Sequence, residues 1–397
     1  MSLCLPARRV SQPAWLRNEL WRRARAVPSL DLRFAENKSL RDAVTGQSLI
    51  TFTRASSATY VDSAGVIRTA TTDEARFDHN PVTGESLGLL VEEQRTNLLL
   101  HNRTLTNAAW VATNITAVKD QTGADGVSSG ASSITATAGN GTILQTITSA
   151  SAARATSAYV RRITGTGTIE MTQDNGSTWT AVTVTNAWTR VTIPSATVTN
   201  PVAGFRIVTS GDAIAVDYVQ CENGAFSTSA IETTTATVTR SADVVSISGS
   251  NFSSWYRQDE GTVFSAFSIP TSVTAAGARV YNISNSDGSN LRWLRLQGGT
   301  NRLYEVTDSS LQQAVFSAGT FSAGVVYRGA IGLRANDFGF SDNGSAPTID
   351  TSGTLNTADR MGIGIDASGG APLNGHLRRL CFWPRRLGNE VLQSITQ

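Results

Sequence analysis

The feature that most constrains the fold of this chain is the alternation of apolar and polar residues with a period of two. Between residues 97 and 240, short runs such as "TSAYVRRI", "TIEMTQD" and "IAVDYVQCE" alternate apolar and polar positions, and turn signals such as "TAGNGT" and "QDNGST" separate them. Alternation of this kind, in segments rich in Thr, Val and Ile, predicts strands with one buried face. No helical pattern of about 10–15 residues lies between the runs, which argues against alternating strand–helix units. The sequence therefore predicts an all-β fold of layered sheets, a β-sandwich or jelly roll.

Similar strand patterns flank this region on both sides. After residue 28, "SLITFTRASSATYVDSAGVIRTA" indicates strands with a turn at "DSAG", and "LGLLVEEQRTNLLL" indicates a strand and a connector. After residue 240, "GTVFSAFSIP", "LRWLRLQGG" and "HLRRLCFWPRRL" indicate strands, and "NEVLQSITQ" a short closing helix. We therefore expect four parts: a basic, partly helical docking arm over 1–29, a small β-rich anchor platform over 30–97, a jelly roll over 98–240 and a second β-sandwich over 241–397.

The first part differs from the rest in its charge. Residues 1–28 contain six arginines and one glutamate, whereas the whole chain carries a formal net charge of only +2. In "PAWLRNELWRRARAV", Pro13 stands at a helix start, and apolar residues follow near helical spacing with the arginines on the other face. This pattern predicts an amphipathic helix that either docks on a partner or packs on its own domain; one short basic helix does not predict nucleic-acid binding. The residues expected to make the docking contact are Trp15, Leu16, Leu20, Trp21, Arg22 and Arg23.

Several classes of protein are not expected from this sequence. No run of about 18 apolar residues is present to span a bilayer, and no apolar core follows the early Arg8–Arg9 pair as in a secretory signal. The cysteines are odd in number and far apart, so they predict neither a disulfide framework nor a metal site. We expect a chain that folds in a cytoplasm with reduced thiols.

The sequence offers little for catalysis. None of the three histidines stands in a zinc-binding pattern, and no nucleophile elbow or P-loop is present. A glycoside hydrolase needs two carboxylates that face each other about 5–10 Å apart. On one regular strand, residues separated by an odd number point to opposite faces, and each of the best pairs is separated in this way: Glu92 with Glu93, Asp212 with Asp217, and Glu305 with Asp308. We therefore expect no enzymatic activity, and a polysaccharide depolymerase is the less favoured alternative.

Carbohydrate binding needs only an aromatic surface and a few planar polar side chains. Trp179 follows the turn "DNGS", and Trp293 and Arg295 lie two residues apart, so on a strand they share a face able to bind a polar or acidic partner. The alternatives are a tryptophan in the core, a solvated strand face or a subunit contact. No cofactor is expected; Asp287 in "NSDGSN" could supply oxygen to Ca²⁺, but Asp-Gly is also a common hairpin turn.

Three longer segments resemble a known group of proteins. "ITFTRASSATYVDSAGVIRTA" with "ARFDHNPVTGESLGLLVEEQRTNLL", then "VQCENGAFSTSAIETTTATVTRSADVVSI", then "LNGHLRRLCFWPRRLGNEVLQSIT" occur in that order. They resemble structural proteins of tailed bacteriophages and prophages, and the likeness covers roughly Leu30 to Gln397.

The resemblance implies a carbohydrate-binding-like jelly roll followed by a concanavalin-A/laminin-G-like sandwich. It further implies a virion protein of the tail-fibre, spike or capsid-decoration type that is assembled in the bacterial host cytoplasm. Such a chain is expected to form a homotrimer, to contact capsid, portal or tail proteins, and to attach to host cell-surface polysaccharide. A purely structural decoration or cement protein is the alternative, because fold alone does not establish binding.

The charged and leucine-rich stretch over residues 76–102 suggests a platform that anchors the following jelly roll to its neighbours. We expect Arg76, Asp78, Glu92, Glu93 and Arg95 to form salt bridges within the platform or between subunits. Surface ion pairs contribute only about 0–1 kcal/mol each, so apolar contacts should dominate the assembly. The residues expected to make these contacts include Leu89 and Leu98.

Overall fold

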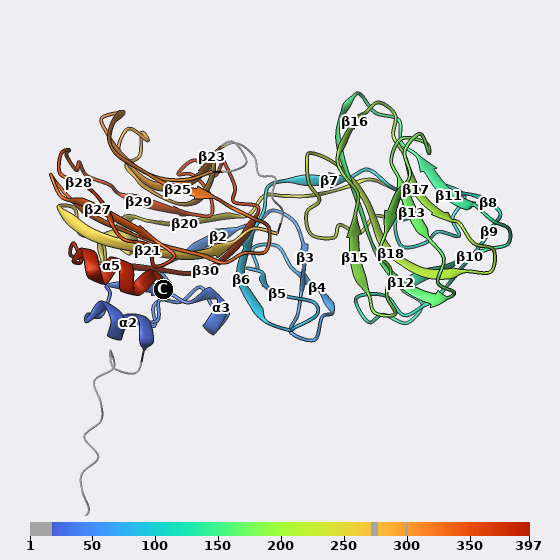
Figure 1. The fold of residues 1–397 in the computed structure, drawn as a ribbon, viewed down its shortest axis with the longest axis horizontal. Coiled ribbons are helices and arrows are strands. Elements are labelled where there is room, and N and C mark those ends of the chain that lie inside the picture. Colours follow the sequence, from blue (N-terminus) through green and yellow to red (C-terminus); the bar gives the residue numbers. More distant parts are fainter. Residues whose placement is uncertain (1–17, 271–276, 298–300) are drawn as a thin grey trace, which may run out of the picture.

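The computed structural model describes residues 18–270, 277–297 and 301–397, and it contains two β-sandwiches side by side (Figure 1). This confirms the predicted all-β fold. Helices are short where the chain is described: α2 (Glu19–Ala24), α3 (Phe34–Asn37), α4 (Gly249–Ser253) and the expected closing helix α5 (Asn389–Thr396). None of these helices is long and apolar enough to cross a membrane. Trp15 and Leu16 lie outside the described residues.

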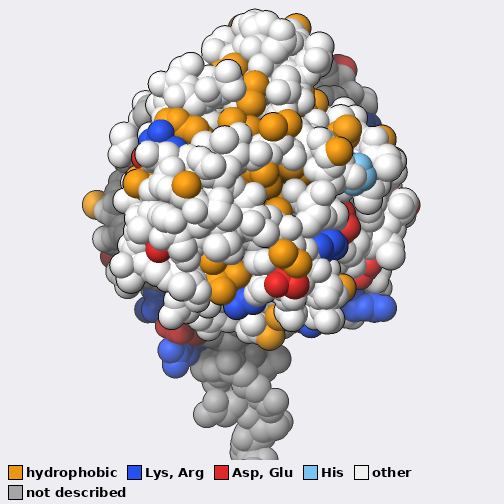
Figure 2. Space-filling view, turned by 90° about the vertical axis from the view of Figure 1, so that its right-hand side faces the viewer, with side chains coloured by type: hydrophobic (Ala, Val, Ile, Leu, Met, Phe, Trp, Pro, Cys, Tyr) orange, Lys and Arg blue, Asp and Glu red, His pale blue; other side chains and the backbone are white. Residues whose placement is uncertain are grey.

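The jelly roll is built from two antiparallel sheets. One contains β15 (Thr189–Thr192), β12 (Ala152–Thr164), β18 (Ala213–Asn223), β10 (Ala131–Ala136) and β9 (Ile115–Gln121), with β16 (Ala196–Val198) paired to β12. The other contains β14 (Thr180–Val182), β13 (Ile169–Thr172), β17 (Val202–Ile207), β11 (Gly141–Thr146) and β8 (Val111–Thr113). The alternating strands bury Ile134, Phe205 and Val216 in one core. The outer end of this sandwich shows mainly uncharged side chains with scattered hydrophobic ones (Figure 2).

The second sandwich also has two sheets. The eight-stranded sheet contains β28 (Thr348–Asp350), β27 (Phe338–Asp342), β26 (Tyr327–Arg334), β21 (Glu260–Ser268), β30 (Gly375–Trp383), β6 (Ser86–Val91) and β5 (Phe77–His79), with β1 (Leu30–Leu32) paired to β30. The seven-stranded sheet contains β2 (Thr51–Thr53), β20 (Val244–Ser248), β29 (Arg360–Ile363), β22 (Ala278–Ser284), β23 (Leu291–Gln297), β24 (Asn301–Asp308) and β25 (Leu311–Thr320). Phe267, Leu294 and Phe338 lie in the core of this sandwich.

The segment expected to form a separate platform is instead divided among other parts of the fold. Four of its strands, β1, β2, β5 and β6, complete the sheets of the second sandwich, and only the hairpin of β3 (Ala58–Val61) and β4 (Ile67–Ala70) pairs within itself. Leu89 of β6 pairs with Leu377 of β30 and is completely buried. Leu98 is half-buried and packs against the jelly-roll core. A short apolar strand buries its surface most fully by extending an existing sheet, and Leu89 therefore lies in the core of the second sandwich.

The N-terminal helix packs on its own chain, which was the alternative to docking. Leu20 packs beside the apolar residues of α5, and the indole of buried Trp21 donates a hydrogen bond from Nε1 to Asp31 Oδ2 at 2.9 Å. Arg23 donates to the carbonyl oxygen of Ser394 at 2.9 Å. Arg22 is exposed to solvent. The described part of the arm is therefore fixed against the second sandwich.

A buried ion network lies where the two sandwiches meet, near the strand pair β7 (Arg95–Asn97) and β19 (Val238–Arg240). Its members, called here the junction network, are Arg54, Arg76, Glu92, Arg240 and Asp243. Arg76 donates to Glu92 at 2.7 Å and to Asp243 at 2.5 Å. Arg240 donates to Glu92 at 2.5 Å.

The network accounts for the charges of the segment before the jelly roll. Every oxygen of Glu92 and Asp243 accepts a hydrogen bond, and the backbone N–H of Ser229 is one of the donors to Glu92. The neighbouring Asp78 accepts from His376 at 2.8 Å, and Glu93 pairs with Arg95. The expected salt bridges therefore form within one chain, and they join the segment 30–97 to both sandwiches.

Candidate functional site

One polar row crosses the outer face of the seven-stranded sheet. The antiparallel register sets Gly362, Asn282, Trp293, Glu305 and Val315 beside one another on five adjacent strands, from β29 to β25. Residues directly opposite in a sheet point to the same face, so these side chains gather on one surface. The burial of β23 alternates, with Leu294 and Leu296 buried on the core side and Trp293 half-buried on the outer side.

The sequence prediction that Trp293 and Arg295 share a face is confirmed. Trp293 Nε1 donates to Glu305 Oε2 at 3.0 Å, and Arg295 Nε donates to the same oxygen at 2.9 Å. Arg279, the cross-strand partner of Arg295, lies over the indole with its guanidinium carbon 3.8 Å from the ring centroid. The guanidinium carbon of Arg295 lies 5.6 Å from the same centroid. We call Arg279, Asn282, Trp293, Arg295 and Glu305 the outer-face cluster.

The outer-face cluster carries positive charge that its own carboxylate does not offset. Burial and then the adjacent Arg295 lower the pKa of Arg279 to about 10, despite the opposing effects of Asp366 and Glu305. Asp366 makes its hydrogen bonds within its own loop, to Ser368 and Gly370. An anion bound beside Arg279 would therefore be stabilised by charge that is already in place.

Two buried polar atoms of the cluster lack a partner among the described residues. They are the Oδ1 of Asn282, a residue that is only 1% exposed, and the Nε of Arg279. Such atoms are costly when left unpaired, so a bound ligand or water that reaches them would gain stability.

A loop that follows β29 borders the row. The backbone approaches so closely that a side chain at Gly362 would place a Cβ atom 2.7 Å from the carbonyl oxygen of Ile365. The loop is held by backbone hydrogen bonds from Gly364 to Val280 and from Arg279 to Ala371, each 2.9 Å long. The loop therefore fixes one side of the cluster, while β25 on the other side exposes Val315 (43%).

The second predicted tryptophan lies elsewhere and in a different electrostatic setting. Trp179 precedes β14 in the jelly roll and is half-buried, with the guanidinium carbon of Arg206 4.5 Å from its ring centroid. Arg206 pairs with Glu170 across the sheet at 2.5 Å. The fold thus does not bring Trp179 together with Trp293, and the arginine over Trp179 already has its counter-charge.

The carboxylates considered for catalysis are each held by donors of the chain. Glu92 belongs to the junction network, and Glu93 pairs with Arg95. Asp212 accepts from Gly167 at 2.7 Å, and Asp217 accepts from Arg103 at 2.7 Å. Asp308 accepts from Thr354 and Asn356.

The weak calcium candidate lies in a tight turn. Asp287 accepts from the backbone N–H of Ser289 at 2.8 Å within the connection from β22 to β23. This is the bonding expected of an Asp-Gly hairpin turn. Within 18–270, 277–297 and 301–397, no group of three or more His, Cys, Asp or Glu side chains is arranged to hold a metal ion.

Sequence reasoning missed three members of the outer-face cluster as binding residues: Arg279, Asn282 and Glu305. They stand on strands next to Trp293, and only the register of pairing reveals that they are its neighbours. From the sequence alone, Glu305 is a candidate only as a catalytic acid. Its spacing from Arg295, with a turn signal between the two strands, is the one local sign that they could pair across a hairpin.

Comparison with known proteins gives only distant matches. No family model and no curated protein matches the chain. Among solved structures, the carbohydrate-binding module CBM40 of the Ruminococcus gnavus IT-sialidase, bound to α2,3-sialyllactose, is 13% identical and matches 36% of this chain and 84% of that one, with a TM-score of 0.31. A SAP-like pentraxin from Limulus polyphemus is 12% identical over 35% of this chain and 70% of that one, with a TM-score of 0.27. The NanB sialidase of Streptococcus pneumoniae is 13% identical over 38% of this chain and 26% of that one, with a TM-score of 0.32. Similarity at this level identifies neither a family nor a ligand.

Proposed function

We propose that this chain is a non-catalytic adhesion protein that binds acidic glycans at the outer-face cluster. The observation that carries the proposal is the arrangement of Arg279 and Arg295 around Trp293, in which Glu305 accepts hydrogen bonds from Arg295 and the indole, while Arg279 has no carboxylate partner among the described residues. The carboxylates considered for catalysis are tied to donors of the chain, which supports a role in binding.

The cluster has the groups that recognition of a sugar acid requires. A guanidinium offers two parallel N–H donors to a carboxylate, and such charge-assisted bonds are about twice as strong as neutral ones. Glu305 already orients both Arg295 and the indole of Trp293, so little side-chain freedom is lost on binding.

We propose the surface of a tailed-phage-type particle as the setting, on the basis of the sequence resemblance. In that setting the chain acts as a trimeric tail-fibre, spike or decoration protein that is made in the host cytoplasm. Several copies on one particle would raise modest affinities through effective concentration. The junction network would hold the two sandwiches in a fixed relative orientation as the particle meets the host surface.

The proposal is tested by measuring the affinity of the full chain for a short oligogalacturonate and for the neutral galacto-oligosaccharide of equal length. We expect the acid to bind at least about tenfold more tightly. Arg295→Gln should weaken binding of the acid about tenfold. Arg206→Gln is the matched control, because Arg206 also lies over a tryptophan and pairs with a glutamate, and it should leave binding unchanged.

Equal binding of the acidic and neutral chains, or equal loss in both variants, would contradict the proposal. Complete absence of glycan binding, with stabilisation of the particle by the chain, would favour the purely structural decoration role. The buried junction network is the observation that favours this second role.

A further inference from the structure

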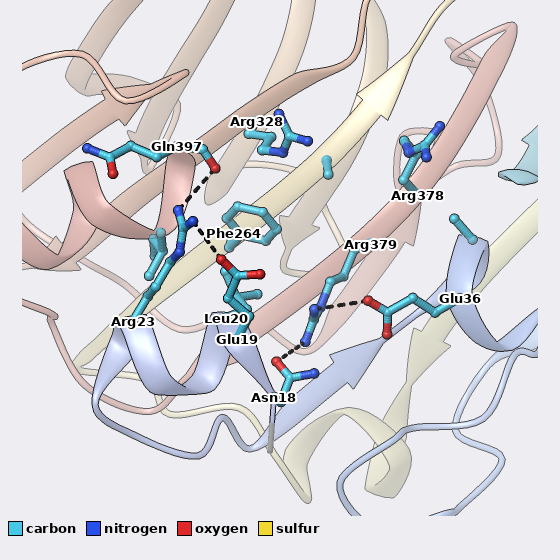
Figure 3. A pocket seen from close by; sticks show the side chains of 13 residues that line it. Asn18, Glu19, Leu20, Arg23, Glu36, Phe264, Arg328, Arg378, Arg379 and Gln397 are labelled. Atoms are coloured by element: carbon cyan, nitrogen blue, oxygen red, sulfur yellow. Dashed lines mark hydrogen bonds and ion pairs between the residues drawn. The ribbon is translucent and has the colours of Figure 1, made fainter. Parts of the chain in front are cut away.

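A second group of arginines stands on the opposite sheet of the same sandwich, around a cavity of about 450 Å³ (Figure 3). Its floor is formed by Phe264 and Ala266 of β21. Its walls come from α2, from α3 and from the last residue of the chain, Gln397, just after α5. The cavity belongs to the eight-stranded sheet, so it is separate from the outer-face cluster on the seven-stranded sheet.

The arginines reach the cavity because of the register and one irregularity in the sheet. Ala266 is the cross-strand partner of both Arg328 on β26 and Arg379 on β30. The register between β21 and β30 shifts after Ala266, which leaves Arg378 without a partner position. A bulge of this kind can turn two consecutive side chains toward one face. Both Arg378 and Arg379 line the cavity, and the small side chain of Ala266 leaves the space between them and Arg328 open.

The four arginines of the cavity are not equally engaged. Arg379 donates to the buried carboxylate of Asp31 at 2.7 Å and 2.8 Å, and Arg23 is bonded to Glu19 and to the end of α5. The side chain of Arg328 makes no hydrogen bond or ion pair with any described residue. Arg378 pairs with Glu85, whose side chain is 59% exposed and therefore easily displaced. In Figure 3 no dashed line joins Arg328 or Arg378 to another lining residue.

The remaining lining groups define what would fit between these two arginines. Asn18, Glu19 and Glu36 stand on the helix side of the cavity and can accept hydrogen bonds from hydroxyl groups. Two carboxylates at the rim also oppose a ligand with several negative charges. The volume lies in the range typical of small-molecule sites, about 300–1,000 Å³.

We infer that this cavity binds a compact, hydroxylated monocarboxylate of the hexuronate class. Its carboxylate lies between Arg328 and Arg378, and its hydroxyls face Asn18, Glu19 and Glu36. The inference is independent of the proposed function, because it concerns another surface and other residues. It gives the chain a second acid-binding site close to the described end of the N-terminal arm.

The test is calorimetric titration of the full chain with sodium glucuronate, with glucose as the neutral probe. We expect binding of glucuronate only, and a loss of at least about tenfold in affinity for Arg328→Gln. Arg334→Gln is the matched control on the same strand; Arg334 is also exposed, is paired with Asp337, and does not line the cavity. Because the side chain of Arg328 makes no hydrogen bond or ion pair with a described residue, Arg328→Gln should melt at the parent temperature.

Trp293→Ala separates this site from the outer-face cluster and should leave unchanged the glucuronate binding that Arg328→Gln weakens. No binding of glucuronate, equal binding of glucose, or unaltered binding by Arg328→Gln would overturn the inference. A signal abolished by Trp293→Ala and kept by Arg328→Gln would also overturn it, and would assign the ligand to the outer-face cluster instead.

Discussion

The junction network and the outer-face cluster are built from the same residue types but differ in burial and in bonding. In the junction network, the side chains of Arg54, Arg76 and Asp243 are completely buried, and every carboxylate oxygen accepts hydrogen bonds from the chain. In the outer-face cluster, the side chain of Arg295 is 24% exposed, and Arg279 and Arg295 lie beside a single carboxylate, that of Glu305.

This difference separates a structural use of charge from a binding use. A buried carboxylate whose bonds are all made within the chain fixes the segments that supply its donors and has nothing left to offer a ligand. A half-exposed cluster with unmatched positive charge contributes little to stability, but it is ready for an anion. The predictions that follow test whether the two clusters behave so differently.

The largest expected effect is on stability. Arg76→Gln should lower the free energy of unfolding by about 3–5 kcal/mol, because it leaves Glu92 and Asp243 buried with a missing partner. Arg295→Gln, at the half-buried outer-face cluster, should cost at most about 1 kcal/mol. Urea denaturation of both variants beside the parent measures the difference. Equal losses would remove the distinction between the two clusters.

The second effect is the contribution of Glu92 in the junction network to the pH dependence of stability. Burial opposes the ionisation of Glu92, but the Arg240 and Arg76 guanidiniums outweigh it and hold the pKa far below the ordinary value of 4.5. A depressed carboxylate pKa stabilises the fold above the unfolded-state value, and this contribution is lost as the pH falls below about 4.5.

Thermal melts from neutral to acidic pH test this expectation. The parent should lose stability below about pH 4.5 more steeply than Glu92→Gln, which has no proton to gain at this position. Identical pH profiles for the two proteins would show that folding does not lower the pKa of Glu92.

The smallest expected effect is that of raising the salt concentration on the melting temperature. Between about 0.1 M and 1 M salt the screening length falls from about 10 Å to about 3 Å, which weakens interactions between exposed charges far more than between buried ones. The melting temperature should therefore change little, whereas the affinity for oligogalacturonate should fall several-fold. Salt-independent binding would indicate that the ligand is not held by Arg279 and Arg295.

Local patterns predicted the strands well and their partners poorly. The alternation in "TSAYVRRI" and "LRWLRLQ" is sufficient to predict β12 and β23, and it also set Trp293 and Arg295 on one face. The pairing of Leu89 with Leu377 joins residues that are almost 300 positions apart, and no local signal reports it. The proposed platform was for this reason not recognised as part of the second sandwich.

The candidate site was predictable to the same limited extent. The alternation with a period of two predicts that Trp293 and Arg295 share a face. Assigning Arg279 and Glu305 to the same site requires the register of three neighbouring strands, which the sequence does not give. The cavity on the other sheet depends on a shift between β21 and β30, which the sequence "HLRRL" does not reveal. Likewise, the helix pattern around Trp21 did not show that its indole is bonded to Asp31.

The central claim is that unmatched positive charge around Trp293 binds acidic glycans, while the paired charge of Arg206 and Glu170 beside Trp179 does not. Titration of the full chain with oligogalacturonate, followed through the indole N–H signals of its tryptophans by NMR, tests it most directly. We expect the Trp293 signal to move and the Trp179 signal to stay in place, because the arginine over Trp179 is already paired with Glu170. A stationary Trp293 signal, or equal shifts of both tryptophans, would contradict the claim.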